Sequence, residues 1–136
     1  MTQVQIQSNT SKKFQQEVKA SAHNFVSDAP ESVGGLATGP DPHELLLASL
    51  GSCTAITLEM YAQKKGWELK SVHVNLDHDM VEDAANPGKK VSKITREIKV
   101  EGNFDSEQME SLKTAADRCP IHKLLSGSNK IETNLN

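Results

Sequence analysis

Aromatic residues and clustered positive charge are scarce in this 136-residue sequence. Only 4% of the residues are aromatic, with one Trp and one Tyr, so platforms for stacking bases or sugars have little material. Lysine and arginine are scattered, and the formal net charge of -3 gives no electrostatic footprint for nucleic acid or an anionic membrane. We therefore expect neither as a partner, and a core filled by aliphatic side chains.

Long apolar runs and an export signal are also missing. The longest charge-free stretch, residues 45–58, would rise only about 21 Å as a helix, short of the roughly 30 Å hydrocarbon core of a membrane. The opening residues MTQVQIQSNTSKK hold no apolar segment after a basic start, so we expect a cytoplasmic protein. The length fits one domain over residues 1–136.

The first third of the sequence predicts short strands and then a loop. Apolar and polar residues alternate over 4–6 and 14–20, which indicates two strands, and 24–27 could form a third. Residues 28–41, DAPESVGGLATGPD, contain three glycines and two prolines. This composition is typical of a loop.

A strong helix signal follows the loop. Asp41, Pro42 and Glu44 supply a capping carboxylate, a proline at the first helical position and a glutamate three residues after the cap. The apolar pattern ends at Lys64, Lys65 and Gly66, so we expect a helix over about 42–65. Because it is apolar almost all round, it should be central, enclosed by sheet or by a second subunit.

Two period-two runs come next and predict a hairpin. Residues 72–80 and 94–100 each place apolar side chains on one face, and the connector EDAANPGKK carries an Asn-Pro-Gly turn signal. In the second run Arg96 shares the parity of the apolar residues and could point inward.

The last third predicts two helices and a strand. Asp105 with Gln108 caps one helix, and Cys119-Pro120 opens a short one that stops at Gly127. Alternation over 131–135 predicts a final strand. The whole reads as an α+β fold with antiparallel sheets packed on a long central helix.

Cys119 has the local features of an acidic thiol. If Pro120 is the first helical residue, the Cys119 sulfur lies near free backbone N–H groups and the positive end of the helix dipole, which lowers the thiol pKa. His122, one turn on, can approach the same sulfur. A reactive thiol and a small capping residue both fit this pattern.

Cys53 lies in the middle of the long helix, in LASLGSCTAITL. An apolar setting raises a thiol pKa, and a free cysteine there is commonly a small hydrophobic residue. In a reducing compartment we do not expect two cysteines 66 positions apart to form a structural disulfide. They are either inert core thiols or a redox pair.

These motifs in combination resemble the OsmC/Ohr superfamily, the osmotically induced and organic-hydroperoxide-resistance proteins. The resemblance rests on GGLATGPDPHELLLASLGSCT, residues 34–54, followed much later by DRCPIH, residues 117–122, and it covers nearly the whole chain. It implies an intertwined homodimer with two equivalent sites at the subunit interface.

The resemblance also implies a thiol-dependent peroxidase without a cofactor or metal. Cys53 would attack an organic hydroperoxide to give a sulfenic acid, and Cys119 would then form a disulfide with it. Glu44 would orient or hydrogen-bond near the thiolate, and an external dithiol would reduce the disulfide. An apolar wall of Leu46, Leu47 and Leu50 would suit alkyl or lipid peroxides as substrates.

One feature departs from the family pattern. Family peroxidases pair the helix-start glutamate with an arginine from the N-terminal region or the preceding loop, but no arginine precedes Arg96 in this sequence. A symmetric partner has the same sequence and cannot supply one. Arg96, or Arg118 beside Cys119, could provide the missing charge near the substrate; both could equally be a strand-end and a surface arginine.

Two other functions fit the sequence less well. The first is a non-catalytic dimer that keeps the fold and binds an apolar small molecule in its interface cleft. The second is a structural zinc protein that uses Cys53, Cys119 and His122. The polar strand face with His73, Asp77 and Asp79 favours solvation over metal binding.

Overall fold

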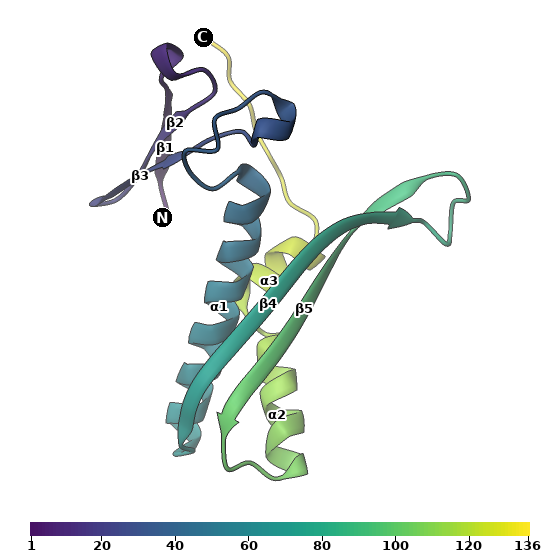
Figure 1. The fold of residues 1–136 in the computed structure, drawn as a ribbon. Helices are drawn as coiled ribbons and strands as arrows, with labels where there is room; N and C mark the ends of the chain where they lie inside the picture. The colour runs from purple at the N-terminus through teal and green to yellow at the C-terminus, as the bar shows by residue number, and fades with distance from the viewer. The chain divides into compact units, whose positions relative to one another are not determined.

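The computed structural model describes residues 1–136, apart from the side chain of Thr10. The chain, traced in Figure 1, divides into two compact units, Met1–Leu46 and Leu47–Asn136. The expectation of a single domain over residues 1–136 therefore stays a prediction.

The first unit contains a three-stranded antiparallel sheet of β1 (Val4–Ser8), β2 (Gln16–Ala20) and β3 (His23–Ser27), in the order β1-β2-β3. The three predicted strands are confirmed. The second begins two residues later than expected, because the short 3-10 helix η1 (Thr10–Lys12) and the left-handed residue Lys13 turn the chain before it.

The glycine-rich loop, which includes the 3-10 helix η2 (Glu31–Val33), is ordered around a buried carboxylate. Asp28 is only 2% exposed, and its side chain accepts hydrogen bonds from the backbone N–H groups of Ala29 (2.8 Å) and Thr38 (3.1 Å) and from the Thr38 hydroxyl (2.6 Å). The Thr38 hydroxyl bond, outweighing the effect of burial, lowers the pKa of Asp28. A Cβ atom at Gly35 or Gly39 would collide with the carbonyl group of a nearby residue, so both glycines allow this close approach.

Asp28 predicts a pH dependence of stability. Since its folded-state pKa lies below the ordinary value of about 3.9, its stabilising effect is complete above that value and is lost as the pH falls through the folded-state pKa. We expect Asp28→Asn to lower the free energy of unfolding at neutral pH and to weaken its dependence on acid. Urea unfolding at neutral and acidic pH measures both. The exposed Asp77→Asn is the control, and equal acid dependence in Asp28→Asn and wild type would contradict the assignment.

The long helix α1 (Pro42–Lys65) has the predicted bounds. Asp41 and Glu44 cap it reciprocally, because each side chain accepts a hydrogen bond from the other's backbone N–H, at 2.9 and 2.8 Å. At the other end Gly66 has a φ of +72°, and the N–H of Trp67 donates to the carbonyl of Ala62 at 2.9 Å. The glycine therefore ends the helix in a left-handed turn.

Only one side of α1 is covered within the described chain. Leu50 and Leu58 are 4% and 1% exposed, whereas Ile56 and Met60 are 47% and 65% exposed. By length and composition alone the helix could cross a membrane, a test that core helices of soluble proteins also pass. The exposed apolar residues leave room for a second subunit.

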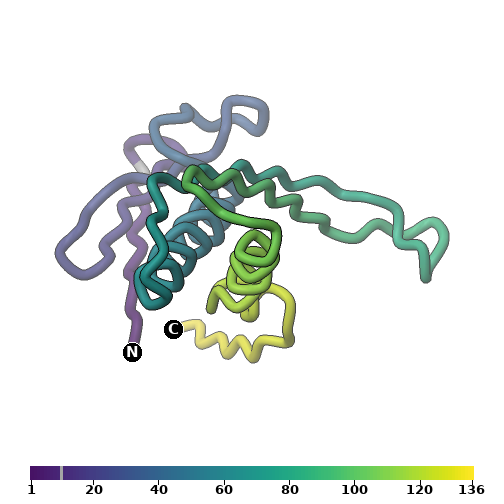
Figure 2. The backbone as a smooth tube through the Cα atoms, turned by 90° about the horizontal axis from the view of Figure 1, so that it is seen from below, coloured from purple at the N-terminus to yellow at the C-terminus, as the bar shows by residue number. Residues whose placement is uncertain are grey.

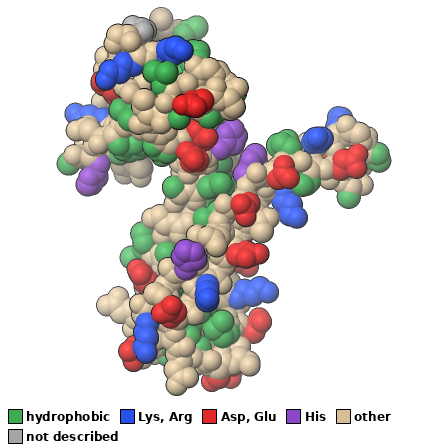
Figure 3. All heavy atoms as spheres, viewed as in Figure 1, with side chains coloured by type: hydrophobic (Ala, Val, Ile, Leu, Met, Phe, Trp, Pro, Cys, Tyr) green, Lys and Arg blue, Asp and Glu red, His purple; other side chains and the backbone are tan. Residues whose placement is uncertain are grey.

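The second unit is built on a long hairpin of β4 (Leu69–Glu82) and β5 (Lys90–Gly102), paired antiparallel. The predicted alternation is confirmed, with even-numbered residues from Val72 to His78 and from Ile94 to Val100 more buried than their neighbours. Figures 1 and 2 both show the hairpin extending past the helices of its own unit. Figure 3 shows basic and acidic side chains interspersed on the visible face, as the scattered charges predicted.

Helix α2 (Ser106–Ala116) closes the core of this unit. Its predicted Asp105–Gln108 capping box is present. Leu58, Leu112, Ala115 and Ala116 form the buried cluster, against which Trp67 and other half-buried apolar residues of the hairpin region pack. The short helix α3 (Pro120–Ser126) follows with Cys119 as its N-cap and Gly127 after its last residue, also as predicted.

The predicted last strand is wrong. Residues 127–136 form no strand in the described structure, and Ile131 and Leu135 are 85% and 96% exposed. A strand is stable when it pairs with a neighbour, and the alternation of Ile131, Thr133 and Leu135 finds none in the described part of this chain.

Candidate active site

The second unit brings its two cysteines together. Cys53 lies on α1 and is half-buried, whereas Cys119 caps α3 and is 0% exposed. Each thiol shifts the pKa of the other, that of Cys53 upward and that of Cys119 downward, so the two side chains are neighbours. The fold therefore brings together two cysteines that are 66 positions apart, which spacing alone could not establish.

The pKa of the Cys119 thiol is lowered. Burial by itself would raise the pKa, but the Cys53 side chain and the backbone N–H groups of His122 and Ile121 together outweigh burial and lower it. The His122 N–H donates to the Cys119 sulfur at 3.5 Å. The predicted acidity is confirmed, and its largest favourable cause is Cys53.

The pKa of the Cys53 thiol is raised, as its apolar setting predicted. Burial contributes most, and the neighbouring Cys119 adds to it through its hydrogen bond and its charge. Of the two thiols, Cys119 therefore loses its proton more readily than Cys53.

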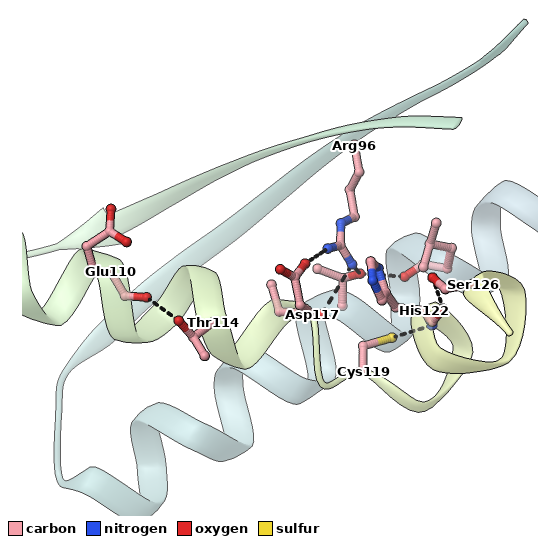
Figure 4. A network of polar contacts seen from close by, with 10 residues as sticks. Arg96, Glu110, Thr114, Asp117, Cys119, His122 and Ser126 are labelled. Atoms are coloured by element: carbon pink, nitrogen blue, oxygen red, sulfur yellow. Dashed lines mark hydrogen bonds and ion pairs between the residues drawn. The ribbon is translucent and has the colours of Figure 1, made fainter. Parts of the chain in front are cut away.

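Arg96 points inward and joins the elements that carry the cysteines. Its side chain is 11% exposed, and Nη1 donates to the Thr54 hydroxyl at 2.9 Å and to the Ala116 carbonyl at 3.3 Å. Nη2 pairs with Asp117 at 2.8 Å. Figure 4 shows Arg96 reaching from β5 to Asp117, close to Cys119.

Sequence reasoning missed Thr54 and Asp117. Thr54 is 0% exposed, and its hydroxyl donates to the Leu50 carbonyl at 2.7 Å. A hydroxyl on an apolar helix directly after one cysteine, and a carboxylate two residues before the other, were visible signals. Only the structure shows that both side chains accept a hydrogen bond from Arg96.

The remaining candidates lie elsewhere. Arg118 is exposed and lines a surface pocket with Tyr61 and Glu110. His122 meets the Cys119 sulfur through its backbone N–H, where the sequence had suggested the side chain. Among the described residues, no group of three or more His, Cys, Asp or Glu could hold a metal ion.

The residues predicted at the helix start are divided between the units. Glu44 and Leu46 belong to the first unit, where the Glu44 carboxylate accepts the Asp41 N–H and Leu46 is 41% exposed. Leu47 is half-buried and Leu50 is buried in the second unit. Their roles toward a thiolate or a peroxide stay predictions.

Two neighbouring thiols in an α+β fold with antiparallel sheets and a long helix define the class, a small dithiol protein. A family model described as OsmC-like protein matches residues 34–134, and the chain belongs to that family. The comparison with curated proteins found no match.

Solved structures share this fold. An OsmC-like protein from Mycoplasma pneumoniae aligns with a TM-score of 0.74 at 18% identity, covering 93% of this chain and 88% of that one. The organic hydroperoxide resistance protein OhrB of Bacillus subtilis aligns with a TM-score of 0.63 at 20% identity, covering 93% and 91%. A putative osmotic stress induced and detoxification response protein from Psychrobacter arcticus aligns with a TM-score of 0.72 at 18% identity, covering 90% of this chain and 86% of that one. The predicted fold class is confirmed.

The thiol pair predicts an order of ionisation. As the pH rises, Cys119 should ionise first, below the ordinary cysteine pKa of about 8.5. Thiolate absorbance in the ultraviolet measures this in wild type, Cys53→Ala and Cys119→Ser. We expect Cys119→Ser to lose the acidic transition and Cys53→Ala to move it to higher pH, because the side chain that lowers the Cys119 pKa most is lost. Coincident transitions in both variants would overturn the assignment.

Proposed function

We propose that this chain is a thiol-dependent peroxidase that reduces organic hydroperoxides in the response to oxidative stress. The contact between a half-buried Cys53 and a buried, acidic Cys119 carries the proposal, because two such thiols are prepared to form a disulfide. Membership of the OsmC-like family and the hydroperoxide-resistance names of several structural relatives support it.

Access favours Cys53 as the nucleophile. Cys119 is 0% exposed and Cys53 is half-buried, so a peroxide meets Cys53 first. Loss of the Cys53 proton to solvent creates a reachable thiolate. Cys119 then acts in the second step.

The chemistry then runs in two balanced steps. The Cys53 thiolate attacks one peroxide oxygen, so that an S–O bond forms, the O–O bond breaks, and the alkoxide leaves and takes a proton from solvent. The Cys119 thiolate then attacks the Cys53 sulfenic sulfur. An S–S bond forms, and hydroxide leaves and is protonated by solvent. An external dithiol reduces the disulfide by exchange, which fits the reducing cytoplasm.

Peroxide treatment tests the proposal. Incubation of reduced protein with cumene hydroperoxide should consume both thiols of each chain and form an intramolecular disulfide. Cys53→Ser should abolish the reaction, because Cys119 is buried, and Cys119→Ser should stop at a dimedone-reactive sulfenic acid. Thiol titration and mass spectrometry of the denatured protein give the readout. The neighbouring Ser52→Ala is the control.

An unchanged thiol count would contradict the peroxidase and favour the other reading of the fold, a non-catalytic dimer that binds an apolar molecule.

The exposed side of α1 supports a homodimer as part of the proposal. Ile56 and Met60 lie four residues apart, on one helix face, and both are exposed in the single chain. We expect sedimentation equilibrium to give a dimer for wild type and dissociation for Met60→Glu. Glu59→Gln, at the adjacent exposed position, is the control, and a monomeric wild type would contradict this assembly.

A further inference from the structure

Arg96 is the point where three elements of the second unit are tied together. From β5 its guanidinium bonds to Thr54 on α1, to the last residue of α2, Ala116, and to Asp117 in the turn that follows. Thr54 is the residue after Cys53, and Asp117 stands two residues before Cys119. The guanidinium therefore bridges the two backbone segments that carry the sulfurs.

The bridge reaches Cys119 through a shared acceptor. The Ala116 carbonyl accepts the Arg96 Nη1 bond at 3.3 Å and the backbone N–H of Cys119 at 3.3 Å. On the α1 side, the Thr54 hydroxyl that accepts the Arg96 Nη1 bond belongs to the residue directly after Cys53. Arg96 is thus one group removed from Cys119 and one residue from Cys53.

The energetics favour a geometric role over a stabilising one. The Asp117 side chain is 59% exposed, and ion pairs of this kind contribute little to stability because solvent screens them. The Arg96 side chain is 11% exposed, so its guanidinium loses most of its hydration on folding, which is unfavourable. What arginine adds here is a rigid planar group whose donors point in fixed directions, which the flexible ammonium of lysine does not supply.

We propose that Arg96 is a positioning residue that holds Cys53 and Cys119 at the separation that a disulfide requires. A disulfide needs an S–S distance of about 2.05 Å and a narrow range of Cα separations. Arg96 fixes that range by fastening the α2–α3 turn to α1. This inference rests on the proposed function, in which the disulfide is the intermediate.

The two chemical steps should depend on Arg96 to different extents. Attack of Cys53 on a peroxide needs only one sulfur, so Arg96 should have little effect on it. Closure needs both, since the S–O bond of the sulfenic acid breaks as the S–S bond to Cys119 forms. Loss of Arg96 should slow closure alone and let sulfenic acid accumulate or oxidise further to sulfinic acid.

Equilibrium with glutathione tests the inference without peroxide. Glutathione disulfide oxidises the thiol pair to the disulfide and is reduced to two glutathione molecules. We expect Arg96→Met to lower the equilibrium constant for the disulfide about tenfold, the factor for losing a charge-assisted hydrogen bond. Arg96→Lys should rescue it only in part. Lys99→Met, which removes an exposed cation from the outward face of the same strand, should match wild type.

Two further measurements keep the test decisive if Arg96→Met folds poorly. Thr54→Val removes the Arg96 link to α1 with a side chain of similar shape, and should also weaken disulfide formation. Dimedone trapping after peroxide should show more sulfenic acid in both variants at an unchanged rate of Cys53 oxidation. A general loss of structure would slow both steps.

The outcomes distinguish this inference from the peroxidase proposal. Equal disulfide equilibrium constants in wild type, Arg96→Met and Thr54→Val would overturn the role of Arg96 and leave the peroxidase untouched. An Arg96-dependent disulfide in a protein that does not react with peroxide would support the positioning role and refute the peroxidase.

Discussion

The contact between Cys53 and Cys119 is the constraint on which the site depends. It exists because the β4–β5 hairpin and α2 carry the chain back, so that the first residue before α3 meets the middle of α1. Each thiol then changes the acidity of the other, and the two thiols differ in burial as well as in pKa. One contact thus gives two cysteines different pKa values.

Arg96, a single arginine among mostly apolar side chains, maintains this arrangement. Its polar contacts add little to the free energy of unfolding. Its bond to the Ala116 carbonyl also satisfies an acceptor at the end of α2, where a positive charge interacts favourably with the helix dipole. The same guanidinium therefore donates to the last carbonyl of α2, pairs with Asp117 in the turn before Cys119 and donates to the Thr54 hydroxyl. Losing it would disturb geometry in several places while removing little net stability.

Local features of the fold followed from the sequence, and long-range ones did not. The caps at Asp41 and Asp105, the Cys119-Pro120 helix start and the hairpin alternation are encoded within a few residues, and all were predicted. The strand predicted at 131–135 is absent. Alternation is a local pattern, whereas a strand also needs a neighbour to pair with, and the described part of the chain offers none to these residues. The Cys53–Cys119 contact and the pairing of Arg96 with Thr54 likewise need tertiary structure.

Two ways of assigning the nucleophile give opposite answers in this chain. Local chemistry favours Cys119, whose pKa is lowered, and family resemblance favours Cys53, whose pKa is raised. A buried thiolate cannot meet a bulky hydroperoxide, and a reachable thiol is a poor nucleophile until it loses its proton. In the proposed peroxidase these two properties serve different steps. The reachable Cys53 would attack the peroxide once it has lost its proton, and the acidic Cys119 would supply the thiolate that closes the disulfide.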